Sequence, residues 1–233
     1  REASGPARNF LLVGSDSRDN LDPEGGGADG CNCSDTLMVL RADPEHGPAL
    51  LSIPRDLWVS IAGRDRSAKI NAAYGYGPET VIRTVREELG IPIHHYVEID
   101  FEGFVKVVDA MGGVEVCVDH LSRDTNTGLL LEPGCHVVDG VTALQYARSR
   151  YFQQFIDDSW VKDPRADLGR IERQQKFLSS AVSGAMEQIA DDPRRLGNLV
   201  NAVGALIKVD SEIDIVSAAA ELAGMADGGI STY

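Results

Sequence analysis

The sequence predicts an α/β fold, a three-layer α-β-α sandwich around a mixed central β-sheet. Two observations lead to this prediction. Short apolar runs such as 9–14 and 114–118 have the length and composition of strands buried in a sheet. Between such runs lie segments such as 78–89, whose apolar residues recur three and four positions apart, as on a helix that covers a sheet. Because strands and helices alternate, we expect helices on both faces of the sheet.

The strands are predicted from apolar runs and alternating patterns bounded by Gly, Pro, Asn and Asp. In chain order they are expected at 9–14, 37–41, 49–53, 57–61, 95–99, 114–118 and within 128–135. The short turn at Asp43-Pro44 makes the second and third of these strands an antiparallel pair. The Gly- and Asp-rich segment 19–33 is expected to be a surface loop, and the segment 152–165 a polar loop that is longer than the motifs on either side of it require.

The helices are predicted from one-sided apolar patterns and from their start residues. In chain order they are expected at 78–89, 101–111, 141–147, 168–189, 193–206 and 213–225. Pro78 stands at the first position of the first helix, where its missing N–H costs nothing, and Asp139-Gly140 precedes the third. In the fourth, Ile171 and Leu178 belong to a buried stripe.

Composition indicates one domain. The chain has 233 residues, of which 43% are hydrophobic, enough for one sizeable core. We expect the functional motifs in a core of about 9–180 and C-terminal helices at about 190–226. The net charge of -14 argues against a nucleic-acid binder, which would carry a broad basic face. No window approaches the roughly 18 consecutive apolar residues that span a bilayer, and a start at Arg1 is compatible with an anchor or signal lost from the N-terminus.

Four cysteines, Cys31, Cys33, Cys117 and Cys135, allow three pairings. The single residue between Cys31 and Cys33 does not match the two-residue gap usual for zinc sites and redox motifs. We favour the disulfides Cys31–Cys33 and Cys117–Cys135, with cross-pairing as the alternative because a ring closed over one residue is strained. Disulfides would place the domain outside the cytoplasm.

Four arginines, Arg148, Arg150, Arg170 and Arg173, lie within one short span of this acidic chain. Arg148 and Arg150 share a side if the backbone there is extended. Arg170 and Arg173 share a side if a helix begins near Leu168, and its first turn would also present unpaired N–H groups to an anion. One such arginine alone would be best explained as a surface ion-pair partner. Because like charges repel and guanidinium groups match phosphate oxygens, we interpret the cluster as one wall of a phosphate or pyrophosphate site.

Two acids, Asp16 and Asp35, lie at the ends of predicted buried strands. A carboxylate there is costly to desolvate, and a divalent cation such as Mg²⁺ would relieve that cost. Capping of a loop or strand end explains either acid equally well on its own. Together with Arg18 and Arg55 they make a phosphate-plus-metal site coherent. The Walker A loop and the GxSxG elbow are absent from the sequence.

Seven motifs, taken in order between about 9 and 178, resemble the LytR-CpsA-Psr family. They are Gly14-Ser-Asp16-Ser-Arg18, Ser34-Asp35-Thr36, Ser52-Ile-Pro-Arg55-Asp56, Lys69-Ile-Asn71-Ala-Ala-Tyr74, Ala110-Met-Gly-Gly113-Val, Tyr146-Ala-Arg148-Ser-Arg150 and Asp167-Leu-Gly-Arg170-Ile-Glu-Arg173-Gln174. The cysteine pattern looks most like that of actinobacterial members.

The resemblance implies a membrane-anchored phosphotransferase on the extracytoplasmic face of the cytoplasmic membrane, with the anchor outside this chain. Such enzymes move a glycan-phosphate from a polyprenyl-pyrophosphate-linked donor to a sugar hydroxyl of peptidoglycan, and the glycopolymer expected here is arabinogalactan. By motif, the pyrophosphate would be bound by Arg18, Arg55, Lys69, Arg148, Arg150, Asp167, Arg170, Arg173 and Gln174. Asp16 and Asp35 would bind Mg²⁺ (or Mn²⁺), and one of them would take the proton of the attacking hydroxyl. The expected catalytic set is Asp16, Asp35, Arg55, Arg148 and Arg150.

Two other functions use the same residues. The first is a pyrophosphatase that takes water as acceptor, and the second is a non-catalytic binder of polyprenyl-linked glycans. A polyprenyl tail also needs an apolar tunnel, for which Val81, Val85, Phe104 and Val108 are candidates, although plain core is the favoured interpretation of these positions.

Overall fold

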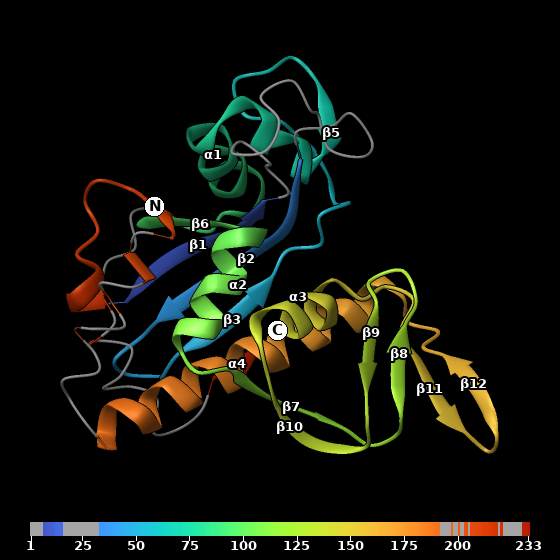
Figure 1. Cartoon of the computed structure of the whole chain (residues 1–233). Helices are drawn as coiled ribbons and strands as arrows, with labels where there is room; N and C mark the ends of the chain where they lie inside the picture. Colours follow the sequence, from blue (N-terminus) through green and yellow to red (C-terminus); the bar gives the residue numbers. More distant parts are fainter. Residues whose placement is uncertain are drawn as a thin grey trace. The chain divides into compact units, whose positions relative to one another are not determined.

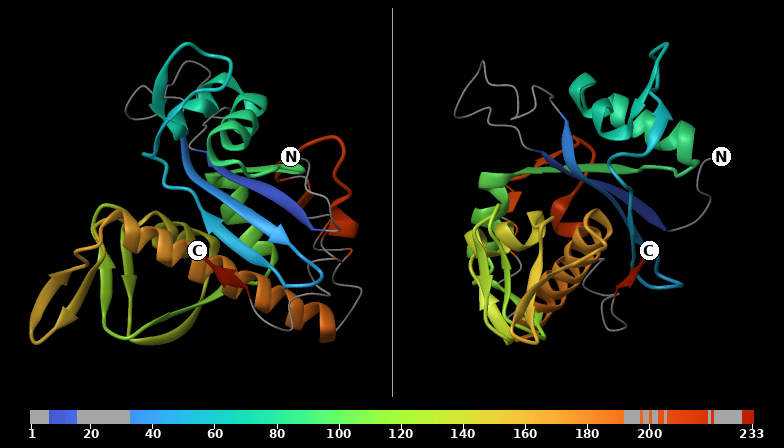
Figure 2. Two further views of the ribbon diagram at one scale, coloured as in Figure 1. Left: turned by 180° about the vertical axis from the view of Figure 1, so that it is seen from behind. Right: turned by 90° about the vertical axis from the view of Figure 1, so that its right-hand side faces the viewer.

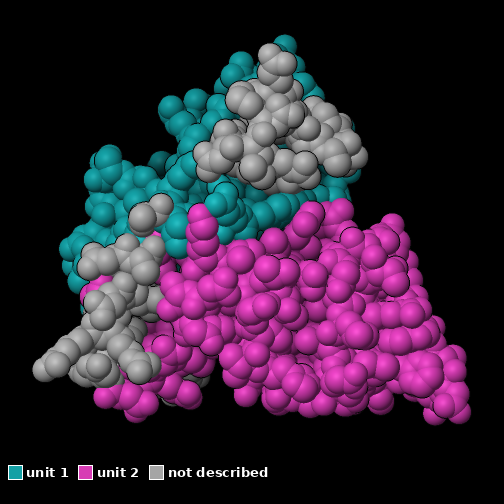
Figure 3. Space-filling model, viewed as in Figure 1, with its two compact units in different colours: residues 1–103, 204–233 teal, residues 104–203 magenta. Residues whose placement is uncertain are grey.

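The computed structural model describes residues 7–15, 33–191, 197, 200, 203–204, 206–218, 220 and 230–233. The chain divides into two compact units, unit 1 with residues 1–103 and 204–233, and unit 2 with residues 104–203 (Figure 3). Among the described residues, no helix combines the length and the apolarity needed to cross a bilayer.

Unit 1 is built on a six-stranded mixed sheet (Figure 1). Its strands, in spatial order, are β13 (Lys208–Val209), β6 (His95–Asp100), β1 (Arg8–Ser15), β2 (Ser34–Ala42), β3 (Ala49–Ser52) and β14 (Ser231–Thr232). β1 runs parallel to β6 and β14 parallel to β3, whereas the other neighbours are antiparallel. The predicted α/β fold around a mixed central sheet is confirmed, as is the antiparallel pairing of β2 with β3.

One face of this sheet is covered by α1 (Pro78–Leu89). The β1–β2 register sets Leu11 opposite Val39, and Val81 and Val85 of the helix pack in the same buried cluster. Burying each such side chain contributes about 1.5–3 kcal/mol to folding. Val81 and Val85 are therefore core side chains in this structure. The helix ends at Gly90, which adopts the left-handed conformation that closes many helices.

A smaller part of unit 1 carries site residues. The predicted short strand is β4 (Trp58–Ser60), which pairs with β5 (Ser67–Lys69) in a separate two-stranded sheet. The 3-10 helix η1 (Ile70–Tyr76) follows directly, and the N–H of Ile70 donates to the carbonyl of Leu57 at 2.7 Å. These bonds fix the backbone on either side of Lys69.

In the continuously described part of unit 2, residues 104–191, helices accompany two small sheets. The helices are α2 (Phe101–Ala110), whose first residues belong to unit 1, α3 (Gly140–Arg148) and α4 (Asp167–Asp191). One sheet pairs β7 (Val114–Val118) with β10 (Gly134–Val138), and the other has the order β12 (Ser159–Lys162), β11 (Gln153–Ile156), β8 (Ser122–Asp124), β9 (Leu129–Leu131). A second apolar cluster joins α2, α3, α4 and these sheets, with Val108 buried in it and Phe104 packed against it.

The segment 152–165 is not a polar loop, as expected, but contains the hairpin β11–β12 at the edge of the four-stranded sheet (Figure 2). Its turn residues Asp157 and Asp158 both have positive φ, 48° and 58°. This is the backbone of the two-residue turns that match the twist of a hairpin. The prediction failed because the turn lacks the glycine that usually marks this geometry. The C-terminal helix predicted at 193–206 falls largely outside the described residues. The one predicted at 213–225 is helical at 215–218 and 220, and positions 219 and 221–225 lie outside the described residues.

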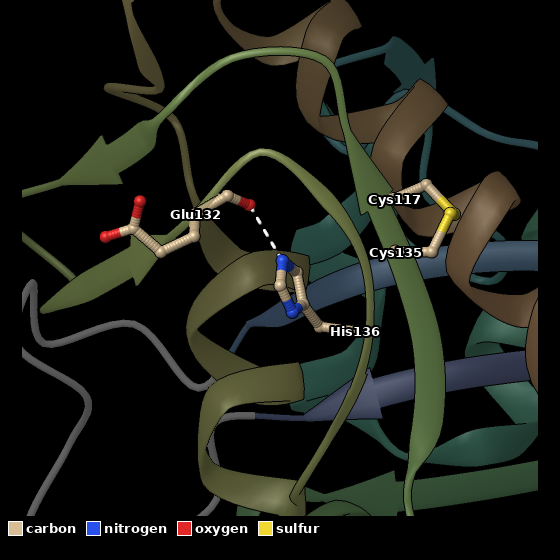
Figure 4. Close-up of a disulfide and its surroundings, with 4 residues drawn as sticks. All are labelled: Cys117, Glu132, Cys135 and His136. Atoms are coloured by element: carbon tan, nitrogen blue, oxygen red, sulfur yellow. Dashed lines mark hydrogen bonds between the residues drawn. A yellow bond between two sulfur atoms is a disulfide. The ribbon is translucent and has the colours of Figure 1, made fainter.

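Cys117 and Cys135 form a disulfide, as predicted, between directly paired positions of β7 and β10 (Figure 4). A loop of this length, 18 residues, corresponds to a stabilisation of about 3 kcal/mol. Nearby, a ring nitrogen of His136 lies 2.9 Å from the carbonyl oxygen of Glu132. Cys33 is also disulfide-bonded. Its predicted partner, Cys31, lies outside the described residues.

Candidate functional site

The predicted site residues of unit 1 form a row of alternating charges. Nη1 of Arg55 donates to Oδ1 of Asp35 at 2.7 Å, and Nε of Arg55 lies 3.9 Å from Asp56. Nζ of Lys69 lies 2.6 Å from the other oxygen of Asp56. The side chains of Asp35 and Arg55 are both partly exposed, so neither charge is withdrawn from water and an incoming ligand can reach both.

Asp56 stands in the same family motif as Arg55, and the sequence predicted no role for it. In the structure it joins Arg55 to Lys69, because its two carboxylate oxygens face one cation each. The N–H of Asn71 also donates to the carbonyl of Arg55 at 3.2 Å. Two motifs distant in the sequence are thus held together by one carboxylate and one backbone bond. Asp16 and Arg18 lie outside the described residues.

In unit 2, the carboxylate of Asp167 contacts two arginines at the start of α4. Nη2 of Arg170 lies 2.9 Å from Oδ1 of Asp167, and Nε of Arg150 lies 3.7 Å from the same oxygen. Arg170 is only 3% exposed, whereas Arg150 remains partly exposed. The helix dipole favours negative charge at this end of α4. The arrangement brings two guanidinium groups to a helix N-terminus, an end that favours anions, and Arg150 is the more accessible of the two.

Arg173 is turned toward the protein interior and is 6% exposed. Its Nη1 lies 3.1 Å from Asp163, its Nη2 donates to the carbonyl of Ser149 at 2.7 Å, and its guanidinium lies 4.5 Å from the ring centre of Phe152. Burial lowers the pKa of Arg173, while the bond to Asp163 acts in the opposite direction. Burial also raises the pKa of Asp163, but the hydrogen bonds from Arg165 and Arg173 outweigh it and lower that pKa overall.

Gln174 behaves like Arg173. Its Nε2 donates to the carbonyl of Ala147 at 3.0 Å. Both side chains, predicted as pyrophosphate contacts, therefore hold the backbone that leaves α3. Arg148 and Arg150 lie on that segment.

The expectation that Arg148 and Arg150 share a side on extended backbone is wrong, because Arg148 is the last residue of α3. The buried residues Ala143, Tyr146 and Ala147 keep the chain helical through Arg148, and the backbone becomes extended only at Ser149. Arg148 is exposed. The direction of the Arg148 side chain is consequently determined by the last turn of α3.

Asp124, which was not predicted as a site residue, has a side chain that is fully buried in unit 2. Its carboxylate accepts hydrogen bonds from the hydroxyl of Ser149 at 2.6 Å and from the N–H groups of Tyr151 at 2.8 Å and Asn126 at 2.9 Å. Burial raises the pKa of Asp124, but these hydrogen bonds outweigh it and lower that pKa. Asp124 could not be found from its surroundings in sequence, which are those of an ordinary turn.

The structure describes one of the two predicted magnesium ligands. Asp35 supplies the oxygen donors that Mg²⁺ prefers and is partly exposed, so it fits as one carboxylate of such a site, with Arg55 on one of its oxygens. Among the described residues, the one group of three clustered metal-ligand types is Glu115 with Cys117 and Cys135. Because these sulfurs are bonded to each other, they offer no thiolate to a metal.

Comparison with known proteins decides the family. The model of the LytR_cpsA_psr family matches residues 2–232. The chain belongs to the LytR-CpsA-Psr family.

Named relatives and a solved structure agree with this assignment. The chain is 38% identical to "Probable cell wall biosynthesis protein LcpB" of Corynebacterium glutamicum over 96% of its own length and 53% of the relative's. It is 35% identical to "Polyisoprenyl-teichoic acid--peptidoglycan teichoic acid transferase TagU" of Halalkalibacterium halodurans over 88% of its own length and 62% of the relative's. The structure of a "LytR-Csp2A-Psr enzyme from Actinomyces oris" superposes with a TM-score of 0.77 at 27% identity, covering 97% of this chain and 79% of that one.

This LytR-CpsA-Psr chain thus spans between half and two thirds of the length of the curated relatives it matches. Its family motifs are distributed over both units. Asp35, Arg55 and Lys69 belong to unit 1, and Arg148, Arg150 and Arg170 to unit 2.

Proposed function

We propose that this chain is the catalytic part of a cell-envelope phosphotransferase, which moves a glycan-phosphate from a polyprenyl-pyrophosphate carrier to a sugar hydroxyl of peptidoglycan. The names of two relatives support this, since one is a probable cell wall biosynthesis protein and the other a transferase that joins teichoic acid to peptidoglycan. The Cys117–Cys135 disulfide supports an extracytoplasmic location, with a membrane anchor outside this chain. Arabinogalactan is the glycopolymer we favour, from the resemblance to actinobacterial members.

The observation that carries the proposal is the contact of both Arg150 and Arg170 with Asp167 at the N-terminus of α4. A diphosphate needs several cationic groups held close together, and guanidinium groups bind its oxygens two at a time. Arg170 is already ordered by burial and by Asp167, so little conformational entropy is lost when it binds an anion. We assign Arg150 and Arg170 to the pyrophosphate, with Arg148 beside them in sequence at the end of α3.

In the proposed reaction, the oxygen of the sugar hydroxyl attacks the phosphorus that carries the glycan. The bond between this phosphorus and the bridging oxygen of the pyrophosphate breaks, and polyprenyl phosphate leaves. The hydroxyl proton passes to a general base. The arginines stabilise the charge that develops on the transferred group and on the leaving phosphate. A Mg²⁺ ion held by Asp35 and Asp16 would supply further charge neutralisation on phosphate oxygens.

A synthetic polyprenyl-pyrophosphate-linked glycan, incubated with the protein and Mg²⁺, tests the proposal. With peptidoglycan fragments present, we expect equal amounts of polyprenyl phosphate and of glycan joined to the acceptor through a phosphodiester. Release of polyprenyl phosphate at the same rate with and without acceptor, and with no joined product, would instead show a pyrophosphatase. Binding of the donor with no release at all would show a non-catalytic carrier.

A further inference from the structure

One face of the four-stranded sheet in unit 2 gathers aromatic and cationic side chains. The strand register places Lys162, Gln153, Arg123 and Leu130 in one row across all four strands. Phe155 and Trp160 form a second pair on the same side, because Phe155 lies two residues beyond Gln153. We call these six residues the aromatic-cationic face. The opposite side of β8 and β9, with Ser122, Asp124, Leu129 and Leu131, is buried.

Contacts within the aromatic-cationic face hold its side chains in place. Nε of Arg123 donates to Oε1 of Gln153 at 2.9 Å, and the guanidinium lies 3.8 Å from the centre of the Trp160 ring. The rings of Phe155 and Trp160 are 5.3 Å apart. At the margin, Nζ of Lys162 lies 4.5 Å from the ring centre of Tyr151. Such cation–π pairs orient a flat ring and a group of hydrogen-bond donors side by side.

The face is accessible to a large ligand. Leu130 is 62% exposed and Phe155 38%, which is unusual for large apolar side chains gathered on one sheet, and Tyr151 at the margin is 51% exposed. The row from β12 to β9 spans three strand spacings, about 14 Å, which is longer than a single sugar ring. A chain of sugars is therefore a better match to the face than a monosaccharide.

The charge of the face indicates what binds there. The chain has a net charge of -14, yet the described strand residues on this face include Arg123 and Lys162 and no acid. The acidic residues of the hairpin, Asp157 and Asp158, are confined to its turn. A partner with negative charges and flat apolar surfaces is complementary to this arrangement. Sugar rings supply such surfaces through their C–H groups, and carboxylates on a glycan supply the charge.

We infer that the aromatic-cationic face binds the acceptor, a glycan strand that carries carboxylates. The inference rests on the proposed function and adds the surface that would position the acceptor strand. An anionic membrane surface is a poorer match, because the Trp160 ring lies against Arg123 and Phe155 and is only partly exposed. Rings that enter a membrane interface are instead free to insert.

Binding of soluble peptidoglycan fragments of several disaccharides, with their peptide carboxylates intact, tests the inference. By calorimetry, we expect Lys162→Glu and Trp160→Ala each to weaken binding by about tenfold or more. Lys176→Glu is the matched control, because Lys176 is an exposed lysine of α4 in the same unit and lies outside the aromatic-cationic face, in an ion pair with Glu172. It should bind as the unchanged protein does. Circular dichroism and thermal melting show whether each variant is folded, and Lys162→Glu removes no buried group.

Three results would overturn the inference. The first is fragment binding that is the same in Lys162→Glu, Trp160→Ala and the unchanged protein. The second is binding to phosphatidylglycerol vesicles that both variants lose while fragment binding is kept, which would make the face a membrane surface. Failure of the proposed function looks different, because no phosphodiester product would form even where fragments bind. Third, if transfer proceeds with an unchanged KM for acceptor in both variants, the proposed function stands, but the aromatic-cationic face does not bind the acceptor.

Discussion

The hydroxyl of Ser149 donates a 2.6 Å hydrogen bond to the buried carboxylate of Asp124. Ser149 is the residue between Arg148 and Arg150, and its carbonyl accepts a second hydrogen bond, from Arg173. The linker between the two family arginines is thus held by its side chain and by its backbone. Two charged residues that face inward decide where two outward arginines lie.

Asp124→Asn should lower the free energy of unfolding by about 2 kcal/mol, because an amide loses the charge that strengthens the bonds from Ser149 and Tyr151 and presents a donor to one of them. Urea denaturation at neutral pH measures this. Asp139→Asn is the control, since Asp139 is the exposed N-cap of α3 and accepts a bond from the N–H of Thr142. Asparagine is an equally good cap, so that variant should lose little. Equal losses in the two variants would contradict the special role of Asp124.

The contribution of Asp124 should depend on pH in a defined direction. Its pKa is lowered in the folded protein, so the folded state binds the proton less tightly than the unfolded state does. Its stabilisation is complete above the unfolded value of 3.8 and is lost as the pH falls through the lower folded value. The difference in unfolding free energy between the unchanged protein and Asp124→Asn should be constant from about pH 7 to about pH 5 and shrink below about pH 4. A difference that grows on acidification would refute this.

Arg173→Ala should destabilise the protein by about 3–5 kcal/mol, because it removes one member of a buried ion pair and leaves the Ser149 carbonyl without its donor. Arg165 offers a matched comparison, since it contacts the same carboxylate of Asp163 but its side chain is 57% exposed. Arg165→Ala should cost less than about 1 kcal/mol. Chemical denaturation of both variants decides the question. Similar losses would show that burial of Arg173 does not matter.

Arg148→Ala should reduce transfer by about a hundredfold or more while leaving the melting temperature nearly unchanged, because Arg148 is exposed at the end of α3. Release of polyprenyl phosphate and thermal melting are the two measurements. Arg83→Ala controls for the loss of an exposed helical arginine, since Arg83 pairs with Glu87 on α1. It should retain full activity. An Arg148→Ala protein that remains active would contradict a role of Arg148 in transfer. One that melts far below the parent would assign Arg148 a structural role.

Arg170 requires a different expectation. Because Arg170 is 3% exposed and bonded to Asp167, its replacement by alanine should lower both activity and stability. Arg150 contacts the same carboxylate but is partly exposed. The Arg150→Ala protein should therefore lose activity with a smaller loss of stability. Comparing the loss of activity with the loss of stability in the two variants separates a role in binding the anion from a role in stabilising the start of α4.

Local patterns in the sequence determined much of this protein. Helix α1 has the predicted bounds because the signals for them are local. Pro78 occupies its first turn, Gly90 follows its last residue, and the apolar stripe between them recurs with the helical period. The family assignment likewise followed from short motifs in a fixed order. The Cys117–Cys135 pairing was favoured from four positions alone.

Only the tertiary structure decided how the arginines are supported. Asp124 and Arg173 reach Ser149 across separations of 25 and 24 residues, and neither contact leaves a pattern in the sequence around it. The same holds for the aromatic-cationic face, where Arg123 meets Gln153 across 30 residues of chain. Helical periodicity arises from bonds between neighbours along the chain, so it can be predicted locally. A buried carboxylate takes its partners from wherever folding brings a donor, and that depends on the packing of the whole unit.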